Sequence, residues 1–525
     1  MKFGKTLAAL LAAVMMISLC ACGNGGSASV ESPTLSDASE KLPETSPEQS
    51  TEENSAPEES SENLPEDSSE SEFESESEKP EQPEEPRQSV VSIQHSLDAE
   101  ELEALYKRIS AEKDFPAVNI YTRDGEAILS KERYVESVID VFNCGDEFLL
   151  SAEGGVKVRG NSTADQGDEK PYRIKFTEKQ SMLGLHGGRA YKSWVLLRSF
   201  WNLAPDYTGF NLARTILDGK YYSSDCAYVN LYVNGQSRGV YLLCEQNQAA
   251  EGRVDVTEAK GDEPPTDIGY LLELDNYPDE NEHPFFVIKH SEYEFTDLVG
   301  QTRRLEDACY SIRSDTTTMA QRGFIAKYLR NVYRILVKAA EGELLMFNEN
   351  YDLVSASGTY STAKEAVEAV IDAESLANYL ILEELVQDYD VGEGSFYMAV
   401  DFGKNSVYPR LTFLAPWDFN WGYTEDPSAG YYACTFQPPV MDSDRSNVWF
   451  IAAMKQEWFA ETVKEKWRSL SESGAIVNTA LAVKEHTALL ANDLGEDAWK
   501  TDKAAEICAY VVKRKRWLDK QWLTE

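Results

Sequence analysis

The sequence predicts an α+β fold, in which a sheet-rich N-terminal lobe is followed by a helical C-terminal lobe. Between residues 115 and 290, several short segments alternate apolar and polar side chains, which is typical of half-buried strands. Beyond about residue 315 the apolar side chains recur with helical spacing. Strands and helices are thus segregated along the chain, and this segregation favours the α+β class.

Charge divides the 525-residue chain, which carries 90 acidic and 50 basic residues and a net charge of −40. Residues 23–90 contribute −17 and contain 16 Ser and 8 Pro, so we expect a disordered acidic Ser/Glu/Pro linker that has little to bury. The folded part carries −25 and is assigned to an N-terminal lobe (91–290) and a C-terminal lobe (291–525). This acidity argues against a nucleic-acid partner, because binding to phosphates needs clustered Lys and Arg.

The first 22 residues have the order of a secretory signal peptide. Lys2 and Lys5 precede an apolar run from residue 7 to 19, which is too short to span a bilayer. The run ends in Leu-Cys-Ala-Cys, which resembles the lipobox of bacterial lipoproteins and makes Cys22 the expected lipidation site. We therefore expect an extracytoplasmic protein, lipid-anchored to the bacterial cell membrane and touching it only through the anchor. An ordinary secretory signal is the alternative.

Several common enzyme chemistries have no matching motif. The remaining six cysteines form no C-x-x-C pair, and the five histidines form no H-E-x-x-H, so a zinc site is disfavoured. No G-x-S-x-G nucleophile elbow is present. Tryptophan is abundant, with 10 residues, but no repeated aromatic pattern supports carbohydrate binding beyond core packing.

Local patterns predict the following elements. In the sheet-rich part they are a helix over 97–111 capped by Ser96, a hairpin over 117–128 around Asp124-Gly125, strands over 156–159 and 171–176, a helix near 210–217, a hairpin over 227–245 around Asn234-Gly235, and a strand over 269–275. In the helical part they are helices over 323–340 and 372–387, the latter capped by Asp372, a strand pair over 395–401 and 411–415, and three or so helices over 449–522.

Two aspartates of the C-terminal lobe are candidates for catalysis. Asp390 follows a helix that is apolar on most sides, and Asp418 follows the second short strand. Kinase-like folds place their catalytic pair in this way, with one carboxylate at the acceptor hydroxyl and the other on the metal. The interval from Asp390 to Ser395 equals D-x-x-x-x-N, whose last residue binds a second metal ion. An Asp at the end of an element is also a common cap or turn residue, and that alternative stays open.

Four cations surround one loop and one strand of the N-terminal lobe: Arg159, Lys170, Arg173 and Lys175. Such a group beside a loop of small residues suits polyphosphate binding. Glu245 ends an apolar strand and is the candidate that tethers one of these cations. Solvent-facing residues on an edge strand are the alternative for this group.

Six segments, in this order, resemble the CotH kinase family, named for a bacterial spore-coat protein. They are Val158–Ser162, Lys170–Phe176, Lys192–Leu197, Gly239–Glu245, Gly269–Asp275 and Pro416–Asn420, and they fall within about residues 116 to 425. The resemblance implies an atypical protein-kinase-like two-lobe fold and phosphorylation of secreted or coat proteins, with ATP and Mg²⁺ or Mn²⁺ as cofactors. It also implies that Asp390 is the catalytic Asp, that Asp418 binds the metal, and that the cations lie near the phosphates.

The chain also departs from the family and from ordinary kinases. It has no G-x-G-x-x-G loop, V-A-I-K strand or H-R-D motif. Asp388 stands where family members often have Asn, and residues 206–213 lack the family's common Arg-Asn pair. Our hypothesis is an extracytoplasmic kinase acting on Ser or Thr of a secreted or surface protein, with a preference for basic acceptors that follows from its acidic charge. The rival hypothesis is an inactive surface binding or adhesion module on the same scaffold.

Overall fold

A computed structural model describes residues 97–160, 162–165, 169–198, 202–275, 283–438 and 445–524. The chain divides into two compact units, Met1–Pro86 and Arg87–Glu525, and every described residue belongs to the second unit. The predicted signal peptide, Cys22 and the linker 23–90 therefore lie outside the described residues. Ser96, the predicted cap of the first helix, also lies outside them.

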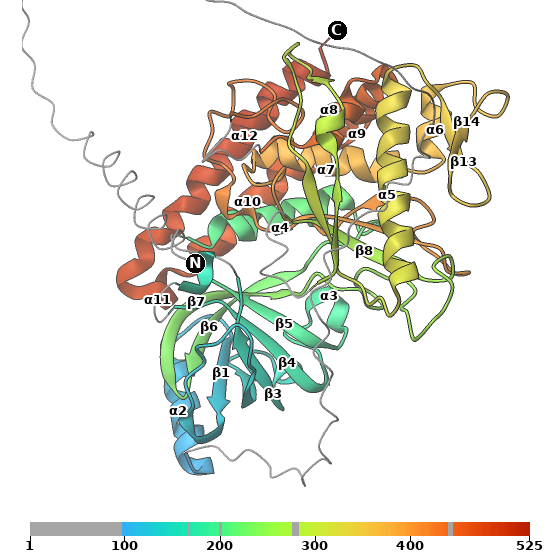
Figure 1. The fold of residues 1–525 in the computed structure, drawn as a ribbon. Coiled ribbons are helices and arrows are strands. Elements are labelled where there is room, and N and C mark those ends of the chain that lie inside the picture. The colour runs from blue at the N-terminus through green and yellow to red at the C-terminus, as the bar shows by residue number, and fades with distance from the viewer. Residues whose placement is uncertain are drawn as a thin grey trace, which may run out of the picture. The chain divides into compact units, whose positions relative to one another are not determined.

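The first part of the described unit is a closed barrel with the strand order β1-β2-β3-β4-β5-β7-β6 (Figure 1). Its strands are β1 (Ala117–Thr122), β2 (Val135–Phe142), β3 (Leu150–Val158), β4 (Tyr172–Gln180), β5 (Tyr191–Leu197), β6 (Cys226–Val233) and β7 (Gln236–Glu245). Neighbouring strands are antiparallel except β1 and β6, which close the barrel in parallel. Inward-facing side chains such as Ile120, Ile174 and Trp194 fill its interior.

A second sheet has the order β16-β15-β8-β12-β9. Its strands are β8 (Gly269–Leu274), β9 (Phe285–Ile288), β12 (Ala308–Ile312), β15 (Phe396–Asp401) and β16 (Thr412–Phe413). Two small antiparallel pairs join β10 (Phe295–Thr296) to β11 (Thr302–Arg303) and β13 (Leu345–Phe347) to β14 (Leu353–Ser355). The sheet-rich stretch 115–290 is thus divided between two sheets, because β8 and β9 pair outside the barrel.

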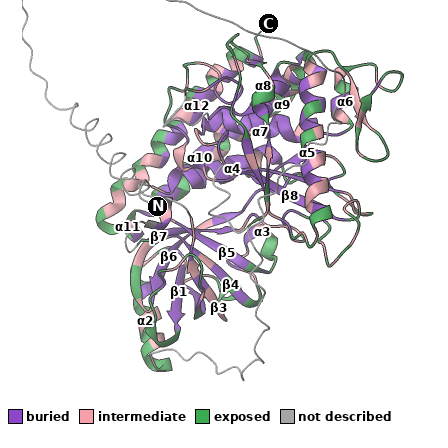
Figure 2. Cartoon of the chain, viewed as in Figure 1, coloured by how far each residue is buried: buried purple, intermediate pink, exposed green. Residues whose placement is uncertain are grey.

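The described helices lie mainly in the C-terminal half, and their bounds are as follows. They are α2 (Ala99–Glu112), α3 (Leu185–Gly188), α4 (Ala204–Leu217), α5 (Met319–Ala340), α6 (Ala363–Glu368), α7 (Ala373–Val386), α8 (Val448–Met454), α9 (Glu457–Ser473), α10 (Ala475–Ala488), α11 (Ala491–Leu494) and α12 (Asp502–Trp522). Helix α7 is buried on nearly every side, as Figure 2 shows, whereas α2 lies on the outside of the barrel with much of its surface exposed.

One continuous core joins the barrel to the helical region. Outward-facing side chains of the barrel wall, among them Tyr228, Leu242 and Cys244, pack in the same cluster as Phe210 of α4 and Leu380 of α7. Asp493 strengthens this junction, because its carboxylate accepts the backbone N–H groups of Asp114 and Phe115 at 2.7 and 2.8 Å. Both apolar packing and hydrogen bonds from several elements therefore stabilise the interface between the barrel and the helices.

Most predicted elements are confirmed, and two details are wrong. Helix α2 begins after Asp98, whose side chain forms a capping box with Glu101, so the cap is Asp98 and not Ser96. Asp124 and Gly125 form a turn with positive φ, but the chain does not return there as a strand. The partner of β1 is β2, which begins ten residues after Gly125. Pairing within the barrel outweighs the local turn signal, because β2 offers a longer apolar segment than the residues directly after the turn.

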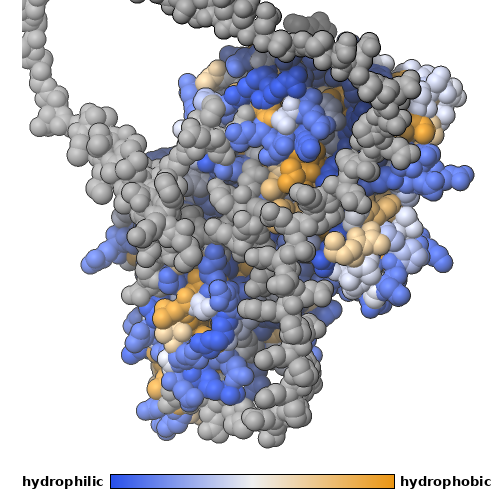
Figure 3. All heavy atoms as spheres, viewed as in Figure 1, coloured by the Kyte–Doolittle hydropathy of each residue, from blue (hydrophilic) through white to orange (hydrophobic). Residues whose placement is uncertain are grey.

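The face shown in Figure 3 is mostly hydrophilic over the described residues, with small separate hydrophobic areas. Exposed large apolar side chains such as Leu129, Leu489 and Trp499 are scattered along the sequence. Among the described helices, none is both long enough and apolar enough to cross a bilayer.

Candidate active site

Asp388 and Asp390 lie in the turn that follows α7. The helix ends at Val386, and Gln387 takes a left-handed conformation (φ 52°) that redirects the chain. The Asp390 backbone N–H donates to Asp388 Oδ1 at 3.3 Å. Asp388 is buried, whereas 27% of the Asp390 side chain is exposed. Asp390 therefore has solvent access that its neighbour lacks.

Asp418 approaches the same region from the segment after β16. Ala415 and Asp418 both have positive φ values, 55° and 68°, which are unusual for residues other than glycine and often mark functional sites. The Asn420 side chain donates a hydrogen bond to Asp418 Oδ1. This backbone course brings the Asp418 charge close enough to raise the pKa values of Asp388 and Asp390.

Burial and like charge act together on these carboxyls. Burial is the largest cause of the raised pKa of Asp390, which lies at about 7, and Asp418 and Glu393 raise it further while Arg445 lowers it. For Asp388, burial and the charges of Glu383 and Asp390 raise the pKa well above its ordinary value. Carboxyl pKa values that are strongly raised by burial and by neighbouring charges are typical of functional sites.

Two residues that the sequence analysis did not select, Arg445 and Asp206, also interact with these carboxyls. Arg445 forms ion pairs with Asp390 and Glu393, and its guanidinium lies 3.8 Å from the Tyr389 ring centroid. Asp206 lies in the first turn of α4, and burial and the charge of Asp418 raise its pKa well above the ordinary value. Neither could be found from local patterns, since no motif surrounds Arg445 in the sequence and Asp206 has the position of a helix-dipole residue.

The predicted cations separate into two groups. Arg159 lies half-buried with its guanidinium 5.7 Å from the Trp417 ring centroid. Burial raises the pKa of Asp418, and the charge of Arg159 partly offsets this rise. Arg173 is half-buried and its Nε makes no hydrogen bond within the described residues. Burial, followed by the charges of Arg159, Arg313 and Arg253, lowers its pKa. Arg159 and Arg173 thus form a cationic region next to the Asp418 segment.

The other two cations have different surroundings. Lys170 Nζ donates to the Ala164 carbonyl at 2.6 Å, which supports the loop that precedes it. Lys175 is exposed, and its ammonium lies 6.0 Å from the Tyr134 ring centroid. The alternation predicted for β4 is confirmed, because Tyr172, Ile174 and Phe176 are buried on the opposite face.

Glu245 is fully buried at the end of β7 and tethers a cation outside the predicted group. It pairs with Arg253 Nε at 3.2 Å, and neither side chain is exposed. It also contacts His186 Nδ1 at 2.9 Å and accepts the Asp225 backbone N–H at 3.0 Å. Its role in this structure is to fix Arg253, whose own charge acts on Arg173.

Ser395 lies on the far side of the Asp390 turn and has a positive φ of 55°. Its carbonyl accepts the Tyr379 hydroxyl at 3.3 Å. Within the described residues, no hydrogen bond joins the Ser395 side chain to Asp418.

The donor atoms suit a hard divalent cation better than zinc. No three His, Cys, Asp or Glu side chains of the described residues are grouped as a metal site. Mg²⁺ needs no such group, because it is commonly held by one or two carboxylates together with water and substrate phosphates. Asp418 offers carboxylate oxygen, and a buried carboxylate oxygen of Asp206 has no hydrogen-bond partner within the described residues. The residues therefore fit Mg²⁺ or Mn²⁺.

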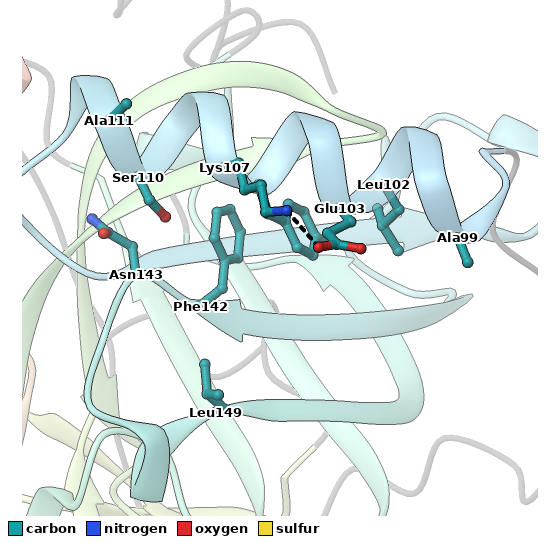
Figure 4. A pocket seen from close by; sticks show the side chains of 10 residues that line it. Ala99, Leu102, Glu103, Lys107, Ser110, Ala111, Phe142, Asn143 and Leu149 are labelled. Carbon is teal, nitrogen blue, oxygen red and sulfur yellow. Dashed lines mark ion pairs between the residues drawn. The ribbon is translucent and has the colours of Figure 1, made fainter.

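An apolar hollow of about 640 Å³ lies elsewhere, along α2 (Figure 4). Leu102 and Tyr106 of the helix line it together with Phe142 and Leu149, and the Tyr106 and Phe142 rings stack with centroids 3.9 Å apart. None of the predicted site residues lines this hollow.

A protein-family model covers most of the unit that contains the described residues. The family model described as CotH kinase protein matches residues 156–520, more than two thirds of the chain. The chain belongs to the CotH kinase protein family. The match extends beyond the six quoted segments into α12, so the C-terminal helices are part of the family domain. No curated protein matches the chain.

Proposed function

We propose that this CotH family member is an extracytoplasmic protein kinase with a kinase-like two-lobe arrangement, which transfers phosphate from ATP to Ser or Thr of a secreted or surface protein. The observation that supports the proposal is the charge interaction between Asp390 and Asp418, which come from separate segments, together with the interaction of Arg159 with Asp418. Phosphoryl transfer requires one carboxylate at the acceptor hydroxyl, another that binds the metal, and cations that neutralise the phosphates.

In this proposal Asp390 orients the acceptor hydroxyl and takes its proton. The hydroxyl oxygen bonds to the γ-phosphorus of ATP as the bond between phosphorus and the β–γ bridging oxygen breaks and ADP leaves. Arg445 holds Asp390 Oδ1 and thereby fixes the carboxylate while its other oxygen is left for the acceptor. A raised pKa of about 7 suits a group that must gain and lose a proton near neutral pH.

The remaining roles follow from position. Asp418, with Ser395 as the candidate second ligand, would hold Mg²⁺ or Mn²⁺, which neutralises phosphate charge when bound. Arg159 and Arg173 are the cations best placed for the phosphates, because burial strengthens their interaction with an anion. Lys175 is exposed and contributes less, and Lys170 supports the loop.

The proposed location rests on the N-terminal sequence. Lipidation of Cys22 and the acidic linker 23–90 would hold the kinase outside the cell at a distance from its membrane. The charge of −25 on residues 91–525 favours basic acceptor segments and disfavours nucleic acid.

An inactive binding or adhesion module is the second candidate. It is favoured by the contacts of Lys170 and Glu245, which serve the loop and Arg253 instead of the expected kinase-like Lys–Glu pair. Carbohydrate binding through exposed aromatics has less support, because Trp499 alone among the tryptophans with described side chains is exposed.

The test measures transfer of labelled phosphate from ATP, with Mn²⁺ or Mg²⁺, to the full-length chain itself and to the basic protein histone and the acidic protein casein. We expect labelling that falls at least 100-fold in Asp418→Ala. The matched control is Asp426→Ala, an exposed residue that should label like wild type. Transfer should rise as the pH increases through about 7, since Asp390 must be deprotonated to accept the proton.

Equal labelling by wild type and Asp418→Ala would reject the mechanism. Absence of heat on titration with millimolar ATP and Mn²⁺ would favour the adhesion module. Stronger labelling of casein than of histone would contradict the preference for basic acceptors without touching the mechanism.

A further inference from the structure

Helix α4 packs tightly against the segment that carries Asp418. A Cβ added at Gly209 would lie 2.1 Å from the Phe419 ring, so only glycine permits this approach. The next residue, Phe210, contacts the rings of Trp417 and Phe419 edge-on, with centroids 5.1 and 5.4 Å apart. The helix is thus fixed against both neighbours of Asp418, and its first turn projects toward that residue.

Asp206 lies in that first turn, one helical turn before Phe210. Only 4% of the residue is exposed, and its Oδ1 is buried without a hydrogen bond within the described residues. The contacts of Phe210 with Trp417 and Phe419 bring this turn of the helix to the Asp418 segment, and the charge of Asp418 acts on the Asp206 carboxyl. Arg159 is the cation whose charge acts on both carboxylates, yet within the described residues it forms no ion pair with either.

Burying two neighbouring carboxylates is unfavourable unless something neutralises them. An unpaired buried acceptor alone costs about 1–3 kcal/mol, and a second like charge adds to this. Two occupants remove the cost: a shared proton, or a cation bound between the oxygens. A divalent cation would in addition give the unpartnered Asp206 oxygen a partner, and carboxylate oxygens are ligands that suit Mg²⁺ or Mn²⁺.

We propose that Asp206 is a second carboxylate ligand of the divalent cation at Asp418. The inference rests on the metal-binding role of Asp418 in the proposed function and extends it to a residue of α4, where the chain departs from the family's Arg-Asn pattern. Two carboxylates from elements far apart in sequence then hold the cation before nucleotide arrives. Metal binding would also link the first turn of α4 to the segment that carries Asp418.

The test is calorimetric titration of the full-length chain with MnCl₂ alone, without nucleotide. Wild type should bind Mn²⁺, and Asp206→Asn and Asp418→Asn should each weaken binding at least tenfold. Asp372→Asn is the matched control, since Asp372 also lies at a helix start but caps α7; it should bind like wild type. Asp206→Ser removes the carboxylate with a smaller side chain and gives the same reading if the asparagine variant folds poorly.

Thermal unfolding in EDTA and in Mn²⁺ supplies the second readout. Asp206→Asn should be at least as stable as wild type in EDTA, because it removes a repulsive buried carboxylate, and should lose the Mn²⁺-dependent rise in Tm. Binding within twofold of wild type in both Asp206 variants, with Asp418→Asn impaired, would overturn this inference alone. Wild-type binding by Asp418→Asn would overturn the metal role in the proposed function as well, so the two failures are distinguishable.

Discussion

Glu383 and Glu384 are neighbours on α7 and both are buried, but their surroundings are opposite. Glu384 pairs with Arg514 of α12, with neither side chain exposed, and accepts the backbone N–H groups of Tyr432 and Cys434. Glu383 faces Asp388, and its Oε2 has no hydrogen-bond partner within the described residues. One glutamate serves the α7–α12 interface and the other faces the candidate site.

The barrel shows the same division among its cations. Arg253 is fully buried and paired with Glu245, whereas Arg159 and Arg173 form no ion pair with a carboxylate within the described residues. A buried charge that is paired belongs to the scaffold, and one that is left unpaired needs another partner. The paired charges of Arg253 and Glu384 thus contrast with Arg159, Arg173 and Glu383, which form no ion pair within the described residues.

The largest expected effect comes from breaking the scaffold pair. Arg514→Met should lower the free energy of unfolding by about 3–5 kcal/mol, because Glu384 is left buried without its cation. Lys513→Met is the matched control, since Lys513 is exposed and its pair with Asp426 lies at the surface; it should cost less than ~1 kcal/mol. Denaturant unfolding measures both, and equal costs would refute the distinction.

The next effect tests the contact between α4 and the Asp418 segment. Gly209→Ala should destabilise the chain by about 1–3 kcal/mol, because the new methyl group displaces Phe419. Gly323→Ala in α5 meets no atom within 4 Å and should instead stabilise by about 0.5–1 kcal/mol. A stabilising Gly209→Ala would show that α4 does not lie against Phe419.

The two glutamates themselves give the third prediction. Burial and the charge of Glu384 raise the pKa of Glu383 to about 8, so above the ordinary value of 4.5 the folded state keeps a proton that the unfolded state releases. The free energy of unfolding therefore falls as the pH rises from about 5 to 8. Glu383→Gln should be near wild type at pH 4.5 and about 1–2 kcal/mol more stable at pH 7.5.

The matched change at the neighbouring position has the opposite sign. Glu384→Gln should be about 1–3 kcal/mol less stable than wild type at pH 7.5, because it removes the anion that pairs with Arg514. If the free energy of unfolding changed with pH in the same way for both variants, the two glutamates would not differ in their environments, and this prediction would be wrong.

The smallest effect concerns the unpaired cations. Arg159→Gln should weaken ATP binding, measured by titration in Mn²⁺, by about tenfold or 1.4 kcal/mol. Lys175→Gln removes an exposed charge of the same strand group and should weaken it less than about twofold, since solvent screens that charge. A larger loss from Lys175→Gln would place the phosphates on the outer face of β4.

Local patterns predicted the elements well where one face is buried. The alternation around Ile174, the Asn234-Gly235 hairpin and the Asp372 cap are all found. They failed where a turn signal at Asp124-Gly125 competed with longer-range pairing, because the strand that pairs with β1 is chosen by the barrel. The order of the six segments was enough to identify the family, and the match to the family model confirms that identification.

By itself the sequence determined the α+β class, the acidic linker composition, and Asp390 and Asp418 as residues to examine. Only the tertiary structure decided that Asp206 and Arg445 lie beside them, that Glu245 holds Arg253, and that Arg159 and Arg173 differ from Lys170 and Lys175. Periodicity records which face of an element is buried, so it predicts the elements. Charge pairing depends on side chains that meet from distant segments and on their loss of solvent, and neither is written in the local pattern.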